Sequence, residues 1–220
     1  MKIKNLNKIK EQLKSILPAE EFEHLFRYEN LRNIQKQALE MLLTERNLVV
    51  SAPTASGKTW IAELFALYGI FSTNGKVVYT APLKALANEK YKEFKEFKNV
   101  KVGISTGDLD SNDNFLKDYD IIITTCEKLD SLIRHNAVWL NSVKLLIVDE
   151  IHMINDVSRG SVVEMVIAYF YDKARILGLS ATISNADELA DWLKAQLIVS
   201  DERPVKLKYG ILNSNKVLFP

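Results

Sequence analysis

The stretch that decides the fold is Ser51-Ala-Pro-Thr-Ala-Ser-Gly-Lys-Thr59, which lies between an apolar run and a segment with helical periodicity. It matches the phosphate-binding pattern G-x-x-x-x-G-K-[ST] except at the first position, where Ala52 replaces glycine. That position only turns the chain off the strand, and alanine can do this if its φ angle stays negative. Gly57 lets backbone N–H groups close around a phosphate without a Cβ in the way. The loop is therefore predicted to bind phosphate.

Side chains of the same stretch predict how a nucleotide is held. Lys58 is expected to reach the β- and γ-phosphates, and the Thr59 hydroxyl is expected to hold Mg²⁺. An apolar strand before the loop and a helix after it supply the context that this motif requires. The predicted nucleotide-binding residues of the loop are Thr54, Ala55, Ser56, Gly57, Lys58 and Thr59.

Short apolar runs alternate with helical patterns along most of the chain. The runs are mostly continuous rather than alternating, as in strands buried on both faces of a parallel sheet. The predicted strands are Leu48–Ser51, Val77–Thr80, Val100–Ile104, Ile121–Thr124, Leu145–Val148, Ile176–Leu179 and Leu197–Val199. Helices are predicted between them, among them Lys58–Phe71, Leu83–Phe97, Ser161–Tyr171 and Asn185–Ala195. The alternation predicts a doubly wound α/β fold with a mostly parallel sheet and helices on both faces.

Three regions are expected along the chain. Residues 1–28 read as a helical extension packed on the sheet domain, and their lysines are interpreted as a solvated helix face. Residues 29–200 form the sheet domain. The tail from residue 201 to 220 contains Pro204, has no helical period and is expected to lead toward a further domain.

Composition is typical of intracellular globular proteins. The 220 residues are 47% hydrophobic, which is enough for a sizeable core. The net charge of +1 gives no global field that attracts a polyanion, so nucleic-acid binding has to come from local groups. A single cysteine, Cys126, excludes an internal disulfide, and the charged N-terminus is unlike a signal peptide. We expect a cytoplasmic or nucleoid-associated protein without a membrane segment.

A second motif supports the nucleotide prediction. The apolar run Leu145–Val148 ends in Asp149 and Glu150. Asp149 can bind Mg²⁺, usually through water, and Glu150 can orient or activate an attacking water. Both motifs are expected at the carboxyl edge of one parallel sheet, where ligands bind in such folds. Together they predict that the chain binds ATP with Mg²⁺.

Further motifs follow one another in order between Leu31 and Leu212. Asp149-Glu-Ile-His152 is a DExH box, and Ser180-Ala-Thr182 follows a predicted strand. The other segments are Ala81-Pro-Leu-Lys-Ala-Leu-Ala-Asn-Glu89, Ser105-Thr-Gly-Asp108, Thr124–Lys128, Asp130–Arg134, Asn185–Leu193 and Arg203–Val205. This ordered set resembles the superfamily-two DExH helicases of the Ski-two-like group. In particular it resembles the archaeal DNA-repair helicases related to the helicase domain of polymerase theta.

The resemblance implies a RecA-like P-loop NTPase lobe, in a superfamily that commonly has alanine at the first loop position. It implies that Gln35 reads adenine, and that His152, Ser180 and Thr182 couple the γ-phosphate site to strand movement. The chain departs from the family pattern at Asn33-Ile34, where a proline pair is common. Serine is frequent at the position of Cys126, and tryptophan at that of Glu202.

Residues just after the predicted strands indicate a nucleic-acid surface. Motors that bind single strands without sequence preference hold phosphates through backbone amides, hydroxyls and a few cations. The candidate contacts are Pro82, Lys84, Gly107, Thr125 and Lys128. Single-stranded DNA is the substrate that the resemblance implies, and the residues alone leave RNA open.

Two rival patterns are excluded. Gly178-Leu-Ser-Ala-Thr182 nearly matches the nucleophile elbow of α/β-hydrolases, but all three histidines precede the serine, whereas that fold needs one after it. Residues 108–119 begin like an EF-hand loop, but Asp113 stands at the sixth position and Tyr119 at the twelfth, where glycine and glutamate are required.

Two functional classes remain, an ATP-driven nucleic-acid motor and a nucleotide-binding interaction module without turnover. The resemblance implies that ATP is hydrolysed between two lobes, with arginines from the second lobe completing the site. The residues after Thr182 are too few for a second sheet domain. We therefore expect the first lobe alone, with Lys58 and Glu150 as its catalytic residues and little turnover by itself.

Overall fold

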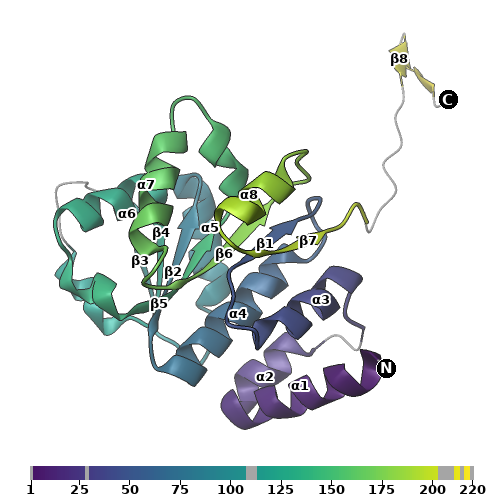
Figure 1. Cartoon of the computed structure of the whole chain (residues 1–220), viewed down its shortest axis with the longest axis horizontal. Coiled ribbons are helices and arrows are strands. Elements are labelled where there is room, and N and C mark those ends of the chain that lie inside the picture. Colours follow the sequence, from purple (N-terminus) through teal and green to yellow (C-terminus); the bar gives the residue numbers. More distant parts are fainter. Residues whose placement is uncertain (1, 28–29, 108–112, 203–210, 214–215, 219–220) are drawn as a thin grey trace.

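The computed structural model describes residues 2–27, 30–107, 113–202, 211–213 and 216–218. Within them, one seven-stranded sheet has the order β3-β4-β2-β5-β6-β1-β7, and all of its neighbouring strands are parallel (Figure 1). Its strands are β1 (Leu48–Ser51), β2 (Lys76–Ala81), β3 (Val102–Ser105), β4 (Ile121–Thr125), β5 (Val143–Val148), β6 (Arg175–Ser180) and β7 (Gln196–Val199). A separate antiparallel pair joins β8 (Ile211–Asn213) to β9 (Lys216–Leu218). Asp108 and the Arg203–Val205 motif lie outside the described residues.

The predicted parallel α/β fold is confirmed. Every predicted strand is present, and the ends differ from the prediction by at most two residues. All side chains of β1 and β4 are buried, because helices cover both faces of the sheet.

Helices form a layer on each side of the sheet (Figure 1). Buried side chains of α1 to α5 form one core cluster with the sheet, and those of α6, α7 and α8 form a second. Val77 and Tyr79 belong to the first cluster and Val78 to the second, because successive strand residues point to opposite faces. The helices are α1 (Lys2–Ile16), α2 (Ala19–Leu25), α3 (Asn33–Leu42), α4 (Lys58–Thr73), α5 (Lys84–Phe94), α6 (Cys126–Arg134), α7 (Gly160–Phe170) and α8 (Ala186–Trp192).

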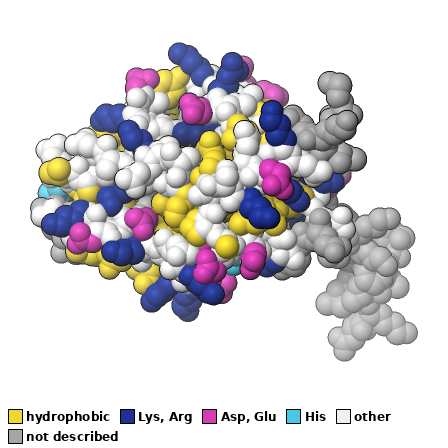
Figure 2. All heavy atoms as spheres, turned by 90° about the horizontal axis from the view of Figure 1, so that it is seen from below, with side chains coloured by type: hydrophobic (Ala, Val, Ile, Leu, Met, Phe, Trp, Pro, Cys, Tyr) yellow, Lys and Arg dark blue, Asp and Glu magenta, His cyan; other side chains and the backbone are white. Residues whose placement is uncertain are grey.

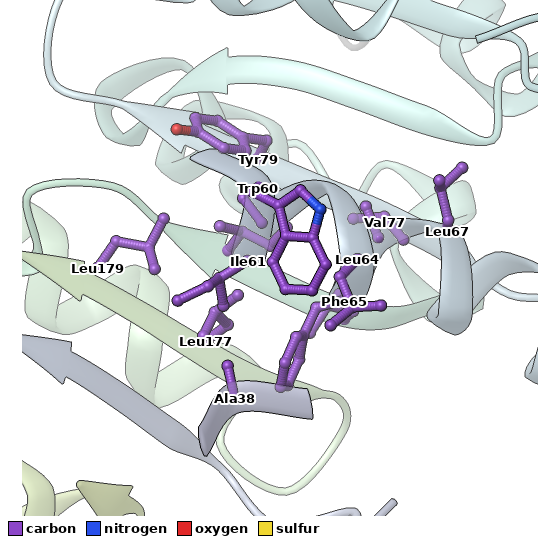
Figure 3. Packing of buried hydrophobic residues seen from close by; sticks show 14 of the residues in the cluster. Ala38, Trp60, Ile61, Leu64, Phe65, Leu67, Val77, Tyr79, Leu177 and Leu179 are labelled. Atoms are coloured by element: carbon purple, nitrogen blue, oxygen red, sulfur yellow. The ribbon is translucent and has the colours of Figure 1, made fainter. Parts of the chain in front are cut away.

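Helix α4 lies at the centre of the first core. Every residue from Trp60 to Leu67 is buried. Figure 3 shows the side chains of this helix packed among Leu177 and Leu179 of β6 and Val77 and Tyr79 of β2. Burial on nearly all sides fixes α4, and with it the loop that ends where the helix begins.

The N-terminal helices α1 and α2 pack on this first core. Their apolar residues Ile9, Leu13, Leu17 and Leu25 belong to the same buried cluster as α4. The indole Nε1 of Trp60 donates a hydrogen bond of 2.7 Å to the Leu25 carbonyl. Both contacts join the helices to the sheet domain.

Glu21 fastens α2 to the connection between α5 and β3. Its carboxylate accepts hydrogen bonds from the backbone N–H groups of Lys98 (3.0 Å) and Asn99 (2.8 Å) and from Asn99 Nδ2 (2.8 Å). Burial alone would raise the pKa of Glu21, but these hydrogen bonds outweigh it and lower the pKa. Helix α5 ends at Phe94 rather than at the predicted Phe97, because the N–H groups of Glu96 and Phe97 bond to carbonyls three residues back and Glu21 takes the next two N–H groups.

Helix α8 is also shorter than predicted. It ends at Trp192 instead of Ala195, because Lys194 adopts a left-handed φ of 48°, a common way of closing a helix. Asn185 occupies the N-cap position, but its side chain makes no capping hydrogen bond in the described structure.

The surface mixes charges of both signs. On the face in Figure 2, basic and acidic side chains are interspersed around a central strip of hydrophobic side chains. This mixture agrees with the net charge of +1. No helix among the described residues is long and apolar enough to cross a bilayer.

Replacing Glu21 by alanine is expected to lower the free energy of unfolding by about 2–4 kcal/mol, because three donors lose a charged acceptor. Urea denaturation followed by tryptophan fluorescence measures the change. The exposed neighbour Glu23 is the control, and Glu23→Ala should change the value by less than about 0.5 kcal/mol. Equal effects of the two substitutions would show that the Glu21 contacts do not stabilise the fold.

Candidate functional site

The segments that follow β1, β5 and β6 meet at one end of the sheet, because these strands are neighbours in the order β5-β6-β1. A cavity of about 1020 Å³ lies at this edge. Gln35, Lys58, Thr59, Asp149 and Glu150 are among the residues that line it. Two motifs far apart in the sequence therefore face one space, as expected for a parallel sheet.

The loop between β1 and α4 curves its backbone around this cavity. Ala52 is not among the residues with positive φ, so alanine meets the condition for the first position. Ala55 and Gly57 have left-handed φ angles of 60° and 105°. Such turns direct neighbouring N–H groups toward one point and form a nest that binds anions. The backbone conformation requires glycine there, and a Cβ on residue 57 would also lie 2.7 Å from Gln35 Nε2 and displace that amide.

The Lys58 ammonium is held inside this loop. Nζ donates hydrogen bonds to the carbonyls of Ala52 (2.6 Å) and Pro53 (3.0 Å). Burial lowers the pKa of Lys58, while the negative charges of Glu150 and Asp149 act in the opposite direction. The ammonium is well placed to exchange these carbonyls for phosphate oxygens.

Two buried polar atoms of this region, Ser56 Oγ and Glu150 Oε2, make no hydrogen bond within the described structure, although Glu150 Oε2 lies 3.3 Å from His152 Nδ1. Leaving such an atom unsatisfied costs about 1–3 kcal/mol, and a ligand or water that supplies the partner removes the cost. Ser56 Oγ, the anion nest and Lys58 fit a polyphosphate bound with Mg²⁺, whereas Glu150 Oε2 can only accept and fits a water. Thr59 and Asp149 are the residues that would hold the metal.

Tyr79 positions Asp149. The phenol is 1% exposed and donates a hydrogen bond of 2.6 Å to Asp149 Oδ2. The backbone N–H of Glu150 donates to Oδ1 over 3.0 Å. Burial, followed by the charge of Asp149, raises the pKa of Tyr79 well above its ordinary value, so the phenol stays protonated at neutral pH. Two protein donors thus fix the orientation of this carboxylate.

Glu150, His152 and Ser180 form a short chain of contacts. Glu150 has a left-handed φ of 50°, and its Oε2 lies 3.3 Å from His152 Nδ1. The same ring nitrogen lies 3.2 Å from Ser180 Oγ. Ser180 also meets the phosphate loop, since the Ala52 N–H donates to its carbonyl over 3.1 Å. Two of the predicted coupling residues therefore lie beside Glu150, whereas Thr182 is exposed.

Gln35 lies at the start of α3, against the phosphate loop. Its Oε1 accepts a hydrogen bond of 2.8 Å from the backbone N–H of Arg32, and its amide nitrogen lies over Gly57. The Arg32 guanidinium donates to the Ala55 carbonyl. Helix α3 and the loop are joined here although Asn33-Ile34 replaces the proline pair of the resembling family.

Most nucleic-acid candidates lie on the other half of the same edge. Pro82 and Lys84 follow β2, Gly107 follows β3 and Thr125 ends β4, and these strands are neighbours in the order β3-β4-β2. Lys84 and Gly107 are exposed. A Cβ on residue 107 would meet nothing within 4 Å, so the space beside it is open.

Lys128 requires a correction. Its side chain is 1% exposed, and its ammonium lies 3.2 Å from Asp113 Oδ2. Its backbone N–H donates to Thr125 Oγ1 over 3.3 Å, so the threonine hydroxyl caps α6. The first turn of α6 directs the lysine inward, and the ammonium is not presented to a phosphate as the sequence predicted.

Sequence reasoning missed Arg32, Glu63, Tyr79 and Lys90, which all line the cavity. Tyr79 could have been found as a tyrosine in an aliphatic strand, and Glu63 as a glutamate in the most apolar stretch. Lys90 Nζ donates to Thr59 Oγ1 over 3.2 Å, but nothing in the sequence distinguishes this lysine from the others of α5.

Comparison with protein-family models matches residues 32–189 to the family described as DEAD/DEAH box helicase. Proteins named ATP-dependent DNA helicase Hel308 are similar to this chain. That of Thermococcus kodakarensis is 45% identical and that of Pyrococcus abyssi 48% identical, each over 96% of this chain. That of Thermoplasma acidophilum is 50% identical over 81% of it. The chain spans 18%, 29% and 27% of the lengths of these three proteins.

Among solved structures, the DUF1998 helicase MrfA bound to DNA matches with a TM-score of 0.68 and 24% identity. The match covers 84% of this chain and 30% of that one. At this identity the likeness is one of fold, and it agrees with a RecA-like α/β lobe.

Glu63 gives the structure a measurable pH dependence. Burial raises its pKa from 4.5 to about 7. The stability that protonated Glu63 contributes is complete below pH 4.5 and is lost as the pH rises through 7. Because one pKa unit corresponds to about 1.4 kcal/mol, Glu63→Gln is expected to raise the free energy of unfolding by about 2–3 kcal/mol at pH 8.5 and by less than about 1 kcal/mol at pH 5.

Urea denaturation of the parent and of Glu63→Gln at both pH values measures this difference. Glu23→Gln on the exposed side of α2 serves as the control and should show no such pH dependence. A Glu63→Gln effect of the same size at both pH values would contradict the raised pKa.

Proposed function

We propose that this chain, which belongs to the DEAD/DEAH box helicase family, is the ATP-binding motor lobe of an ATP-dependent DNA helicase. The observation that carries the proposal is the single cavity shared by the phosphate loop, Lys58, Asp149 and Glu150. The similar proteins with 45–50% identity are named ATP-dependent DNA helicases, which supports the same activity for the protein to which this lobe belongs.

In this proposal each group at the cavity has a role toward the nucleotide. Loop amides and Lys58 bind the β- and γ-phosphates. Thr59 and Asp149 hold Mg²⁺, which would neutralise charge on the phosphates. Glu150, whose Oε2 is buried without a hydrogen-bond partner in the described structure, orients the attacking water. Gln35 reads adenine, because a carboxamide offers the base edge both a donor and an acceptor.

Single-stranded DNA is proposed to bind along the β3-β4-β2 half of the sheet edge. Pro82, Lys84 and Gly107 lie there, and backbone and cationic contacts to phosphates suit a motor without sequence preference. Thr125 and Lys128 bond to each other, and Lys128 bonds to Asp113, so their part in the proposed surface is to hold the first turn of α6 in place. DNA is favoured over RNA by the names of the similar proteins.

Coupling between the nucleotide site and the proposed nucleic-acid surface is proposed to start at Glu150. Its contact with His152, and that of His152 with Ser180, link the water-orienting carboxylate to the segment that ends in Thr182. Turnover and translocation are proposed for the lobe joined to a second lobe, as the family resemblance implies. The chain spans less than a third of the length of each of these similar proteins.

Lys58→Ala is expected to weaken binding of Mg-ADP or Mg-ATP by at least about tenfold, because the cation on the β- and γ-phosphates is lost. Isothermal titration calorimetry measures the affinity, and circular dichroism establishes that the variant is folded. Lys92→Ala, at an exposed position of α5, removes a lysine away from the cavity and should bind like the parent. Unchanged affinity in folded Lys58→Ala would refute the assignment of the phosphate loop.

The 220-residue chain is expected to show little ATPase activity with or without single-stranded DNA. In related phosphoryl-transfer enzymes the arginine that stabilises the transition state contributes roughly 10³–10⁵ in rate, and here a second lobe would supply it. Fusion to the second lobe of a Hel308 relative should restore DNA-stimulated turnover. Glu150→Gln should then abolish turnover while nucleotide stays bound.

A steady-state ATPase assay with DNA and with RNA distinguishes the alternatives. Robust turnover by a demonstrated monomer of the chain would contradict the proposal that a second lobe is needed for hydrolysis. A fusion that binds ATP but never turns over would favour a nucleotide-binding interaction module, and stimulation by RNA alone would favour an RNA helicase lobe.

A further inference from the structure

Lys90 of α5 contacts the residue proposed to hold the metal. Its Nζ donates a hydrogen bond of 3.2 Å to Thr59 Oγ1 and lies 2.8 Å from Glu93 Oε2. The Lys90 side chain is only 13% exposed. It lines the same cavity as Lys58 and Asp149. An ammonium group is therefore in contact with the hydroxyl that would otherwise be a Mg²⁺ ligand.

We propose that Lys90 is a built-in cation that substitutes for Mg²⁺ at Thr59 and sets how strongly nucleotide binding depends on the metal. The inference rests on the proposed nucleotide site and deepens it. It concerns a residue of α5, outside the phosphate loop and outside the acidic motif at the end of β5.

The first step of the argument is electrostatic. Like charges at short range repel strongly where water is largely excluded, and Lys90 is mostly buried. Mg²⁺ bound to Thr59 therefore has to displace the ammonium from the hydroxyl. Glu93 already contacts Nζ and offers the displaced ammonium a second position.

The second step concerns nucleotide binding without metal. A polyphosphate needs cations close to it, and Lys58 supplies one from the loop. A lysine ammonium has three donors, of which two are directed to Thr59 and Glu93. A phosphate oxygen beside Thr59 is therefore placed to receive a charge-assisted hydrogen bond from Lys90.

A purely structural account of Lys90 gives a different expectation. An ion pair that only joins two positions three residues apart on a helix stabilises the helix slightly and has no effect on ligands. Under that account, removal of the ammonium leaves the metal dependence of nucleotide binding unchanged. The two accounts are separated by one ratio, the nucleotide affinity with saturating Mg²⁺ divided by the affinity in excess EDTA.

The experiment measures binding of a fluorescent ADP analogue to the 220-residue chain under both conditions. In Lys90→Met the affinity in EDTA should fall by about tenfold or more, because one charge-assisted hydrogen bond is lost. The affinity with Mg²⁺ should stay the same or rise, so the ratio increases by about tenfold or more. Lys90→Arg should keep a ratio close to that of the parent. Lys92→Met is the matched control on the exposed side of α5 and should leave the ratio unchanged.

A second variant tests the same idea with Lys90 in place. Glu93→Gln removes the carboxylate that pairs with Nζ and leaves the ammonium with Thr59 and the phosphates. The affinity in EDTA should then rise, and a higher Mg²⁺ concentration should be needed for half-maximal metal stimulation. This variant decides the matter even if Lys90→Met does not fold.

The outcomes separate this inference from the function on which it rests. Equal ratios in the parent and in folded Lys90→Met, or an unchanged Mg²⁺ requirement in Glu93→Gln, would overturn the role of Lys90 and leave the nucleotide site standing. Absence of nucleotide binding by the folded parent under both conditions would overturn the proposed function itself.

Discussion

Parallel pairing of the strands in the main sheet is the constraint on which the site depends. It brings the carboxyl ends of β1, β5 and β6 to one edge, where the Ala52 N–H donates to the Ser180 carbonyl and Ser51 Oγ donates to the Ala181 carbonyl. A shift of one residue in register would turn every side chain of a strand to the other face. Such a shift between β2 and β5 would separate Tyr79 from Asp149. The pairing and register of the sheet therefore determine where the loops and side chains of the site lie.

The site contains buried polar groups that destabilise the fold because they lack hydrogen-bond partners. Three buried side-chain atoms of the described residues lack a hydrogen-bond partner, and two of them, Ser56 Oγ and Glu150 Oε2, belong to this site. Glu63 is buried beside the same cavity with a raised pKa. Glu21 is as deeply buried elsewhere, but three donors satisfy its carboxylate. Unsatisfied groups and perturbed pKa values that gather at one cavity are typical of a functional site.

Local patterns predicted the strands and the phosphate loop, because burial on both faces of a sheet gives a continuous apolar run and the loop has a glycine beside a lysine. Tertiary contacts give no such pattern in the adjacent sequence. The end of α5 depends on Glu21, far earlier in the chain, and the inward direction of Lys128 depends on Asp113. The contact of Lys90 with Thr59 depends on how α5 is rotated beside α4. Sequence reasoning found the residues that carry a motif and missed those whose role arises from packing.

Helix α5 carries one residue of each proposed binding surface. It begins at Lys84, beside the proposed nucleic-acid surface, and Lys90 lies six residues further on, about 9 Å along the helix axis. Ala87 and Phe94 of this helix are fully buried in the first core, so the residues along it are held by one packed body. If a nucleic-acid strand bound at Lys84 moved this helix, the distance between Lys90 and Thr59 would change. Because coupling between two binding sites is reciprocal, Mg-nucleotide that displaces Lys90 from Thr59 would in turn change the affinity of the surface beside Lys84 for nucleic acid. The contact between an ammonium and a hydroxyl thus offers a physical route from the nucleotide to the nucleic acid that runs through one helix.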